Sequence, residues 1–281
     1  MSKLLAVVNQ KGGVGKTTTV VNLAAALAQL GRRDLVVDLD PQANATSGLG
    51  VDKRTVAPSI YEGLLGSVPL AELVRQHEIP NLFLIPSHAH LSGAEVELVG
   101  QSEREQKLKQ AIGSLRDQYD LTLIDCPPSL GLLTLNALTA SDSLLIPLQC
   151  EYYALEGLTQ LIDTMNLVRE SFNPQLAIEG VVLTMADQRT KLTADVITEV
   201  RRFFKEKVYK TVIPRSVRLS EAPSYGKPIT QYAPTSIGAQ RYVALAQELI
   251  GHAPDIVSSQ NQSEIHQENS IEIPEELSSS S

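Results

Sequence analysis

The sequence predicts an α/β fold: a doubly wound, mainly parallel sheet with helices on both faces. Two observations support this class. Short apolar runs of strand length alternate with stretches in which apolar residues recur at helical spacing. The runs are apolar throughout instead of alternating with polar residues, as in strands that are buried on both faces. Sheets of this kind bind ligands beyond the carboxyl ends of their strands, so polar residues at those ends are the candidates for function.

The elements follow one another in this pattern. Strands are expected at 4–8, 35–40, 82–86, 121–125, 143–147 and 179–184. Helical stretches are expected after residue 18, at 60–65, 70–75 and 106–118, from about 131, and around 158–168. Polar residues 44–50 are expected to form a loop.

Charge and composition suggest one folded domain, 1–250, followed by a tail, 251–281. The tail is rich in Ser, Gln and Glu and contains six acidic residues but no lysine or arginine, so it is predicted to be disordered. The net charge of the whole chain is -8, which leaves only -2 for the domain. Within the domain, residues 189–227 hold ten basic and four acidic residues, a local basic surface of the kind that a phosphate backbone attracts.

Several classes of protein are disfavoured by composition. Cys126 and Cys150 are the two cysteines and form no C-x-x-C pair, so a disulfide framework or a zinc site is not expected. The first apolar run is too short for a signal peptide, and no run approaches the roughly 20 residues of a membrane span. A cytoplasmic protein with reduced thiols is therefore expected.

A glycine-rich turn, 9–18, joins the first strand to the first helix, and this context favours a phosphate-binding loop. Glycines let backbone amides approach a phosphate, and the helix N-terminus adds partial positive charge. Lys16 is expected to reach the outer phosphates of ATP, and the Thr17 hydroxyl to bind Mg²⁺. The predicted nucleotide contacts in this loop are Gly12, Gly13, Val14, Gly15, Lys16, Thr17 and Thr18.

Carboxylates stand at the ends of two predicted strands. Asp125 ends one strand, as the Mg²⁺-binding aspartate of a P-loop hydrolase does. Asp38 and Asp40 lie two residues apart and share a strand face if the strand continues, so that one supports the water shell of the metal and the other orients the attacking water. The alternative is that these aspartates cap a helix or are simply solvated.

The loop departs from the ordinary pattern, since Gln10 replaces a glycine and a second lysine, Lys11, stands at its front. It resembles the deviant Walker A loop of the ParA/MinD group of ATPases. The resemblance implies that Lys11 reaches across a nucleotide-sandwiched homodimer to the partner's phosphates. It also implies that Asp40 is the hydrolytic residue.

Further motifs extend the resemblance over about residues 3–250, and it is specific for chromosomal ParA proteins of the Soj type. These motifs are 38–42, 44–50, 125–136, 149–157 and 213–223. In the last of them, the resemblance implies that Pro214 packs against adenine. Ser216 stands where relatives often carry asparagine and is included among the nucleotide contacts.

The resemblance implies a function. The ATP-bound homodimer of such proteins binds double-stranded nucleoid DNA without sequence preference, and a ParB-like centromere-binding partner triggers an otherwise slow hydrolysis. Arg189 and Arg218 stand at the DNA-contacting positions. The basic residues expected to assist them are Lys191, Arg201, Arg202, Arg215 and Lys227. A cytoplasmic, nucleoid-associated protein that does not bind membranes is implied.

Three alternatives remain. A ParA-like ATPase can position another cargo, such as a plasmid or a microcompartment. A MinD-like membrane-associated ATPase needs a basic amphipathic C-terminal helix, whereas residues 271–281 are acidic and serine-rich. A metabolic enzyme of the same fold, or an iron–sulfur protein that uses Cys126 and Cys150, needs a substrate pocket or cluster ligands, and buried free thiols are the simpler interpretation.

Overall fold

The structure of the chain is a computed structural model that describes residues 2–151, 156–187 and 189–251. The predicted tail lies outside the described residues except for Gly251, which ends a helix.

Seven strands form one sheet in the order β3-β4-β2-β5-β1-β6-β7, and all neighbours are parallel except β3 and β4. The strands are β1 (Lys3–Val7), β2 (Asp34–Asp38), β3 (Arg75–Gln76), β4 (Leu82–Ile85), β5 (Leu121–Asp125), β6 (Ser143–Gln149) and β7 (Ala177–Thr184). The predicted fold class and all six predicted strands are confirmed. The sequence did not indicate β3, because a two-residue strand has no periodicity of its own.

The helices connect these strands. The long ones are α1 (Lys16–Gln29), α8 (Glu156–Ser171), α9 (Lys191–Phe204) and α12 (Ile237–Gly251). The shorter ones are α2 (Asn44–Gly48), α3 (Ile60–Leu64), α4 (Leu70–Leu73), α5 (Leu91–Leu98), α6 (Lys107–Ile112), α7 (Leu132–Ala140), α10 (Val217–Glu221) and α11 (Ile229–Tyr232). Four 3₁₀ turns are η1 (Arg104–Gln106), η2 (Gly113–Gln118), η3 (Lys205–Lys207) and η4 (Ala222–Tyr225).

The helix predicted over 70–75 is shorter than expected, since α4 ends at Leu73 and Arg75 belongs to β3. A further prediction for the elements was wrong: residues 44–48 form helix α2 instead of a loop. The cause is a tertiary contact that local propensity does not contain. The backbone N–H of Thr46 donates to the Asp38 carboxylate at 2.7 Å, and the Thr46 hydroxyl donates to the same oxygen at 2.6 Å. These bonds hold the turn against the end of β2.

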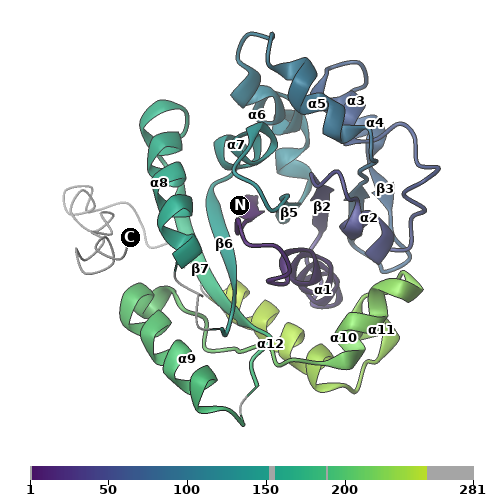
Figure 1. Ribbon diagram of the computed structural model, residues 1–281. Coiled ribbons are helices and arrows are strands. Elements are labelled where there is room, and N and C mark those ends of the chain that lie inside the picture. The colour runs from purple at the N-terminus through teal and green to yellow at the C-terminus, as the bar shows by residue number, and fades with distance from the viewer. Residues whose placement is uncertain (1, 152–155, 188, 252–281) are drawn as a thin grey trace, which may run out of the picture.

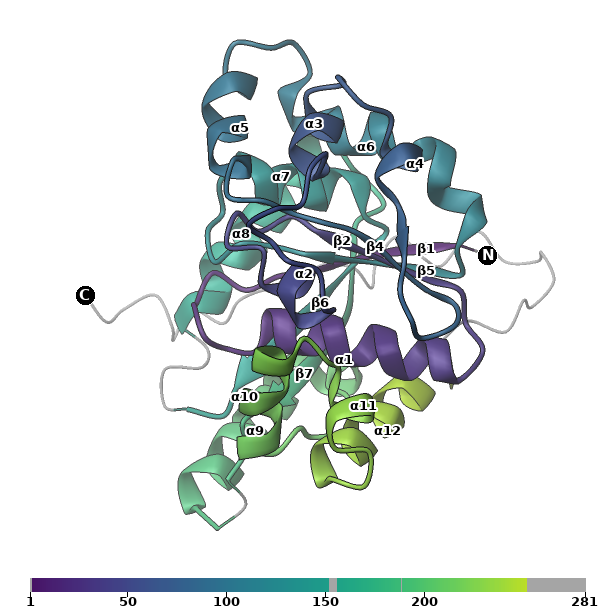
Figure 2. The same cartoon turned by 90° about the vertical axis from the view of Figure 1, so that its right-hand side faces the viewer.

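The sheet separates two layers of helices. Figure 2 shows α3, α5, α6 and α7 on one side of the sheet and α1, α10, α11 and α12 on the other. The view in Figure 1 places the same two groups around the strands. Successive side chains of β2 pack on opposite faces of the sheet, since Leu35 and Val37 belong to one buried core and Val36 to the other. Among the described helices, none is long and apolar enough to span a bilayer.

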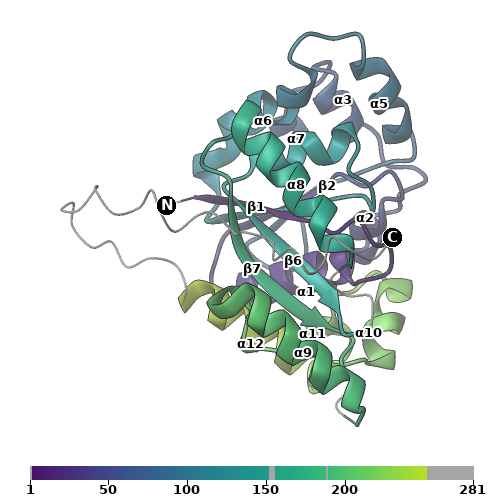
Figure 3. The same ribbon diagram turned by 60° about the vertical axis from the view of Figure 1, so that its left-hand side comes forward.

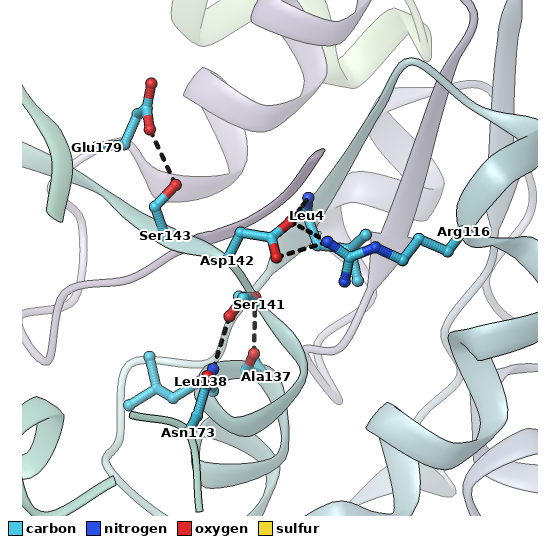
Figure 4. Close-up of polar contacts among 9 residues, drawn as sticks. All are labelled: Leu4, Arg116, Ala137, Leu138, Ser141, Asp142, Ser143, Asn173 and Glu179. Carbon is cyan, nitrogen blue, oxygen red and sulfur yellow. Dashed lines mark hydrogen bonds and ion pairs between the residues drawn. The ribbon is translucent and has the colours of Figure 1, made fainter. Parts of the chain in front are cut away.

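A polar network connects the amino ends of the strands, at the end of the sheet away from the phosphate loop (Figure 4). The Asp142 carboxylate accepts from the Leu4 backbone N–H at 2.8 Å and from the Arg116 guanidinium at 2.6 and 2.7 Å. The Asn173 amide donates to the backbone oxygens of Leu138 and Ser141. These bonds connect helix ends to the starts of β1 and β6. They hold the sheet that positions the residues at the carboxyl ends of its strands.

Asp34, at the amino end of β2, lowers the stability of the folded state. Its carboxylate is buried, and neither oxygen has a hydrogen-bond partner among the described residues. Burial, with a smaller contribution from the charge of Asp120, raises the pKa of Asp34 from 3.8 to about 8. The folded state therefore holds this proton more tightly than the unfolded state, and stability falls as pH rises between about 4 and 8.

We expect Asp34→Asn to raise the free energy of unfolding by an amount that grows with pH. The increment should approach about 1.4 kcal/mol per pH unit between about pH 4 and 8 and level off above that range. Urea denaturation of both proteins at pH 5, 7 and 9 measures it, with the exposed Asp117→Asn as control. A gain that does not change with pH would show that Asp34 ionises in the folded state as it does in the unfolded chain.

Candidate nucleotide-binding site

The loop between β1 and α1 is shaped by glycine and anchored by two strands. Gly13 and Gly15 have φ values of 76° and 89°, in the left-handed region that favours glycine. The Asn9 side chain donates to the Pro147 backbone oxygen at 2.9 Å and accepts from the Lys11 N–H at 3.0 Å. The Thr184 hydroxyl donates to the Val14 backbone oxygen at 2.8 Å. The loop is thus positioned by the ends of β6 and β7.

Helix α1 begins at Lys16 behind this loop. It has no side-chain N-cap and no acidic residue in its first turn, so its N-terminal amides face the loop and favour an anion. The Lys16 ammonium donates to the Lys11 backbone oxygen at 3.1 Å, and the residue is only 7% exposed. Burial lowers the pKa of Lys16, and the Asp125 carboxylate opposes this shift. Lys16 is a cation held at the centre of the loop.

Asp38 and Asp125 face each other in register at the ends of β2 and β5. Both oxygens of Asp38 accept hydrogen bonds, Oδ2 from Thr46 and Oδ1 from the Asp40 N–H at 3.2 Å. In contrast, neither oxygen of Asp125 has a hydrogen-bond partner among the described residues, although both are buried. Burial raises the pKa of Asp38 to about 6, against the lowering effect of the Thr46 bonds.

Asp125 has the chemistry of a magnesium ligand. Burial, followed by the charge of Asp38, raises its pKa, while the nearby Thr17 hydroxyl and Lys16 lower it. A buried carboxylate without a partner is costly unless a cation compensates it. Carboxylate and hydroxyl oxygens are the ligands that Mg²⁺ prefers. Asp125 and Thr17 therefore fit a Mg²⁺ ion, and Asp38 lies beside Asp125 on the neighbouring strand.

Asp40 lies just beyond β2, which ends at Asp38, so the two aspartates do not share a strand face as the sequence suggested. Asp40 is buried, and its Oδ1 accepts from the Gln42 N–H at 2.9 Å. Its backbone oxygen accepts from the Ser87 hydroxyl at 2.8 Å, and the Ser87 N–H donates to the Thr46 hydroxyl at 2.8 Å. A network through Thr46 and Ser87 thus fixes both aspartates.

Unlike the buried Lys16, Lys11 has an exposed side chain. Its side chain is 43% exposed, and its ammonium is 3.3 Å from Glu151 Oε2. The other oxygen of Glu151 lies 3.9 Å from the Arg215 guanidinium. Glu151 links the loop lysine to the segment that carries the predicted DNA-binding arginines, and sequence reasoning had assigned it no role.

The predicted DNA-binding residues lie at the carboxyl end of β7. Ala186 pairs with Pro214, and the Arg215 N–H donates to the Ala186 backbone oxygen at 3.1 Å, so the chain just after β7 lies beside segment 213–215. Arg189 donates to both oxygens of Asp187, at 2.8 and 2.7 Å, and these bonds lower the pKa of Asp187. The four predicted DNA-binding residues are all exposed and lie on these two segments or, for Lys191, at the start of α9 and, for Arg218, in α10. They are Arg189, Lys191, Arg215 and Arg218.

The predicted adenine-contacting residues belong to the same segment. Pro214 and Ser216 are both half-buried, and Ser216 precedes α10. Their neighbour Ala186 lies two residues after Thr184, which holds the phosphate loop. The chain from Thr184 to Ala186 therefore connects the phosphate loop to the segment that carries Pro214 and Ser216.

Both cysteines are buried free thiols. Cys126 follows Asp125 directly, and burial raises its pKa well above the usual value. Burial also raises the pKa of Cys150, to about 11. The protonated thiol is the favoured form at both positions, as expected for packing residues.

Comparison with known proteins agrees with this geometry. Residues 2–178 match the AAA domain family. The chain is 57% identical to the sporulation initiation inhibitor protein Soj of Bacillus subtilis over 249 residues, which cover 89% of this chain and 98% of that protein. It is 53% identical to the chromosome partitioning protein ParA of Myxococcus xanthus, with 89% and 88% covered.

A solved structure also matches, that of cobyrinic acid a,c-diamide synthase from Mycobacterium smegmatis with bound ADP and magnesium. Its TM-score is 0.80 at 39% identity, with 90% of this chain and 95% of that chain covered. The sheet order, the glycine loop followed by Lys16 and the family match all agree. The chain belongs to the Soj/ParA family of chromosome-partitioning P-loop ATPases.

Proposed function

We propose that this chain is a Mg²⁺-dependent ATPase that acts as a dimerisation switch: its ATP-bound homodimer binds nucleoid DNA without sequence preference and segregates chromosomal or plasmid DNA with a ParB-type partner. One observation carries the proposal. Lys16 is buried and its ammonium donates to the backbone of the phosphate loop, whereas the Lys11 side chain is exposed and paired with Glu151. A lysine in that position is available to the phosphates of a second subunit, as an arginine finger is.

Each residue then has a role within the site. The loop amides and Lys16 bind and orient the phosphates. Thr17 and Asp125 hold Mg²⁺, and Asp38 orients its water shell from the neighbouring strand. The metal, when bound, neutralises charge on the phosphates. Asp40 positions the attacking water, since Ser87 and Gln42 fix its backbone and carboxylate. Pro214 and Ser216 contact the base.

Hydrolysis is proposed to be slow until the ParB-type partner acts. The relatives named Soj and ParA support a role in chromosome partitioning, with which such a switch is consistent. Release of the phosphate removes the contact that holds Lys11 across the dimer, so that hydrolysis returns the protein to the monomer. The protein is accordingly proposed to act in the cytoplasm, on the nucleoid.

The DNA contacts are proposed to be Arg189 and Arg218, assisted by Lys191 and Arg215. We expect the double substitution Arg189→Ala/Arg218→Ala to weaken binding of the ATP form to any duplex, on the order of 100-fold, without affecting ATP-dependent dimerisation. Arginine–phosphate contacts supply affinity but no sequence information. Fluorescence anisotropy with ATP at several salt concentrations measures the effect. The slope of log K against log salt should fall by about 1.8 for each arginine position in the dimer.

Arg54 provides a matched control, because it is 84% exposed and pairs with Asp52 two residues earlier, as Arg189 does with Asp187. Arg54→Ala should leave both affinity and slope unchanged. If the double variant also retained them, the DNA would have to be bound by another surface.

A further inference from the structure

A second basic surface lies at the opposite end of α9 from Arg189. Five exposed cations form it, and with Glu199 and Glu206 the stretch has a net charge of +3. We call this surface the α9 basic end, and it consists of Arg201, Arg202, Lys205, Lys207 and Lys210. Among the described residues, Arg202 alone of the five has a carboxylate paired with its side-chain charge, Glu199 at 3.0 Å. The arginines at the other end differ, since Arg189 and Arg218 each face a carboxylate of their own segment.

The last helix of the domain ends beside this surface. The Glu248 carboxylate accepts from the backbone N–H of Lys210 at 2.6 Å and of Thr211 at 3.0 Å. Gly251, three residues later, is the last described residue. Figure 3 shows the end of α12 next to the chain that leaves α9. Residues 252–281 therefore depart from the domain at the α9 basic end.

We propose that the acidic residues of 252–281 dock on the α9 basic end. The segment carries six carboxylates and no lysine or arginine, and they are Asp255, Glu264, Glu268, Glu272, Glu275 and Glu276. Its charge is thus opposite to that of the surface where it begins. It has few apolar residues, so the contact is electrostatic and weakens with salt.

The covalent connection makes such a contact effective. Single exposed ion pairs contribute less than about 1 kcal/mol each. A polar chain of about 25 residues spans roughly 27 Å on average, which exceeds the length of about 21 Å of α9 itself. All six carboxylates are therefore within reach of the surface, at an effective concentration of roughly millimolar. Several weak pairs made at once then hold the segment.

Carbodiimide cross-linking of the full chain tests the docking, because it joins a lysine to a carboxylate only where the two are in contact. The monomeric product is digested and its cross-links are mapped by mass spectrometry. We expect Lys205, Lys207 and Lys210 to be joined to residues between Glu264 and Glu276 at low salt. The yield should fall several-fold in 0.5 M salt, where the Debye length is about 4 Å.

Two full-chain variants and an internal reference serve as controls. Replacing the six carboxylates by their amides should remove these products while leaving all lysines in place. Lys205→Gln/Lys207→Gln/Lys210→Gln should remove them without transferring them elsewhere. Lys109 on α6 is also exposed and belongs to a different helix from the α9 basic end, so it reports random collisions of the tail.

Tail cross-links that form with Lys109 as often as with the α9 basic end would overturn the proposal. So would their absence from the monomer at low salt, which is also the result expected if this surface is reserved for DNA. The experiment contains neither ATP nor DNA, so its outcome is independent of whether the proposed DNA-binding switch is correct. Circular dichroism confirms that each variant is folded.

Discussion

Replacing Lys16 with alanine is expected to abolish ATP binding, with Kd rising by at least about 100-fold. Lys16 is the buried cation of the loop, and its ammonium already lies against the Lys11 backbone oxygen, where the outer phosphates would be bound. A charge-assisted contact in a partly buried site is about twice as strong as a neutral one. Its removal also takes away a positive charge that lies near Asp125 and Asp40, which raises the cost of bringing in further negative charge.

Isothermal titration with ATP and Mg²⁺ measures the effect. Lys53→Ala is a suitable control, since this lysine lies on the surface and donates to Gln42 and Asn44 instead of to the loop. If a folded Lys16→Ala protein retained micromolar affinity for ATP, the assignment of Lys16 to phosphate binding would be wrong.

Asp40→Ala is expected to reduce ATP hydrolysis by about 100-fold or more, while ATP binding and dimerisation persist. Residues that position or activate a nucleophile typically contribute 10²- to 10⁴-fold. Asp40 is held by its own backbone contacts with Ser87 and Asp38, so its carboxylate can be removed without disturbing β2. Asp125 and Thr17 remain to hold the metal.

Single-turnover release of phosphate measures this prediction, together with binding of a fluorescent ATP analogue to show that the site is intact. Asp52→Ala, an exposed aspartate on the following loop, is the control. Normal turnover by Asp40→Ala would assign the positioning of water to another group.

The sequence predicted the parts of the molecule that depend on local pattern. Each main strand is a continuous apolar run, and Lys16 and Thr17 follow a glycine turn that has little reason to exist except to bind phosphate. The family motifs added the role of Lys11. Helix α2 was missed because Thr46 is held by Asp38, eight residues away, and local propensity carries no information on that contact.

The remainder of the site depends on partners that are distant in the chain. Ser87 lies 41 residues from Thr46, and Glu151 lies 140 residues from Lys11. No spacing rule connects such pairs; only the parallel sheet, which gathers strand ends at one edge, brings them together. In contrast, the ion pair between Arg189 and Asp187 joins residues two positions apart. The Asp-x-Arg pattern in the sequence could have predicted it.

The central claim is that ATP controls DNA binding by controlling dimerisation through Lys11. The most direct test is to measure the mass of the protein and its affinity for duplex DNA in the same buffer, with ADP and with ATP, for the wild type and Lys11→Ala. The wild type should double in mass and bind DNA with ATP only. Lys11→Ala should bind ATP yet remain a monomer with weak DNA affinity. An ATP-dependent dimer of Lys11→Ala, or equal DNA binding by the wild type in ADP and ATP, would contradict the account.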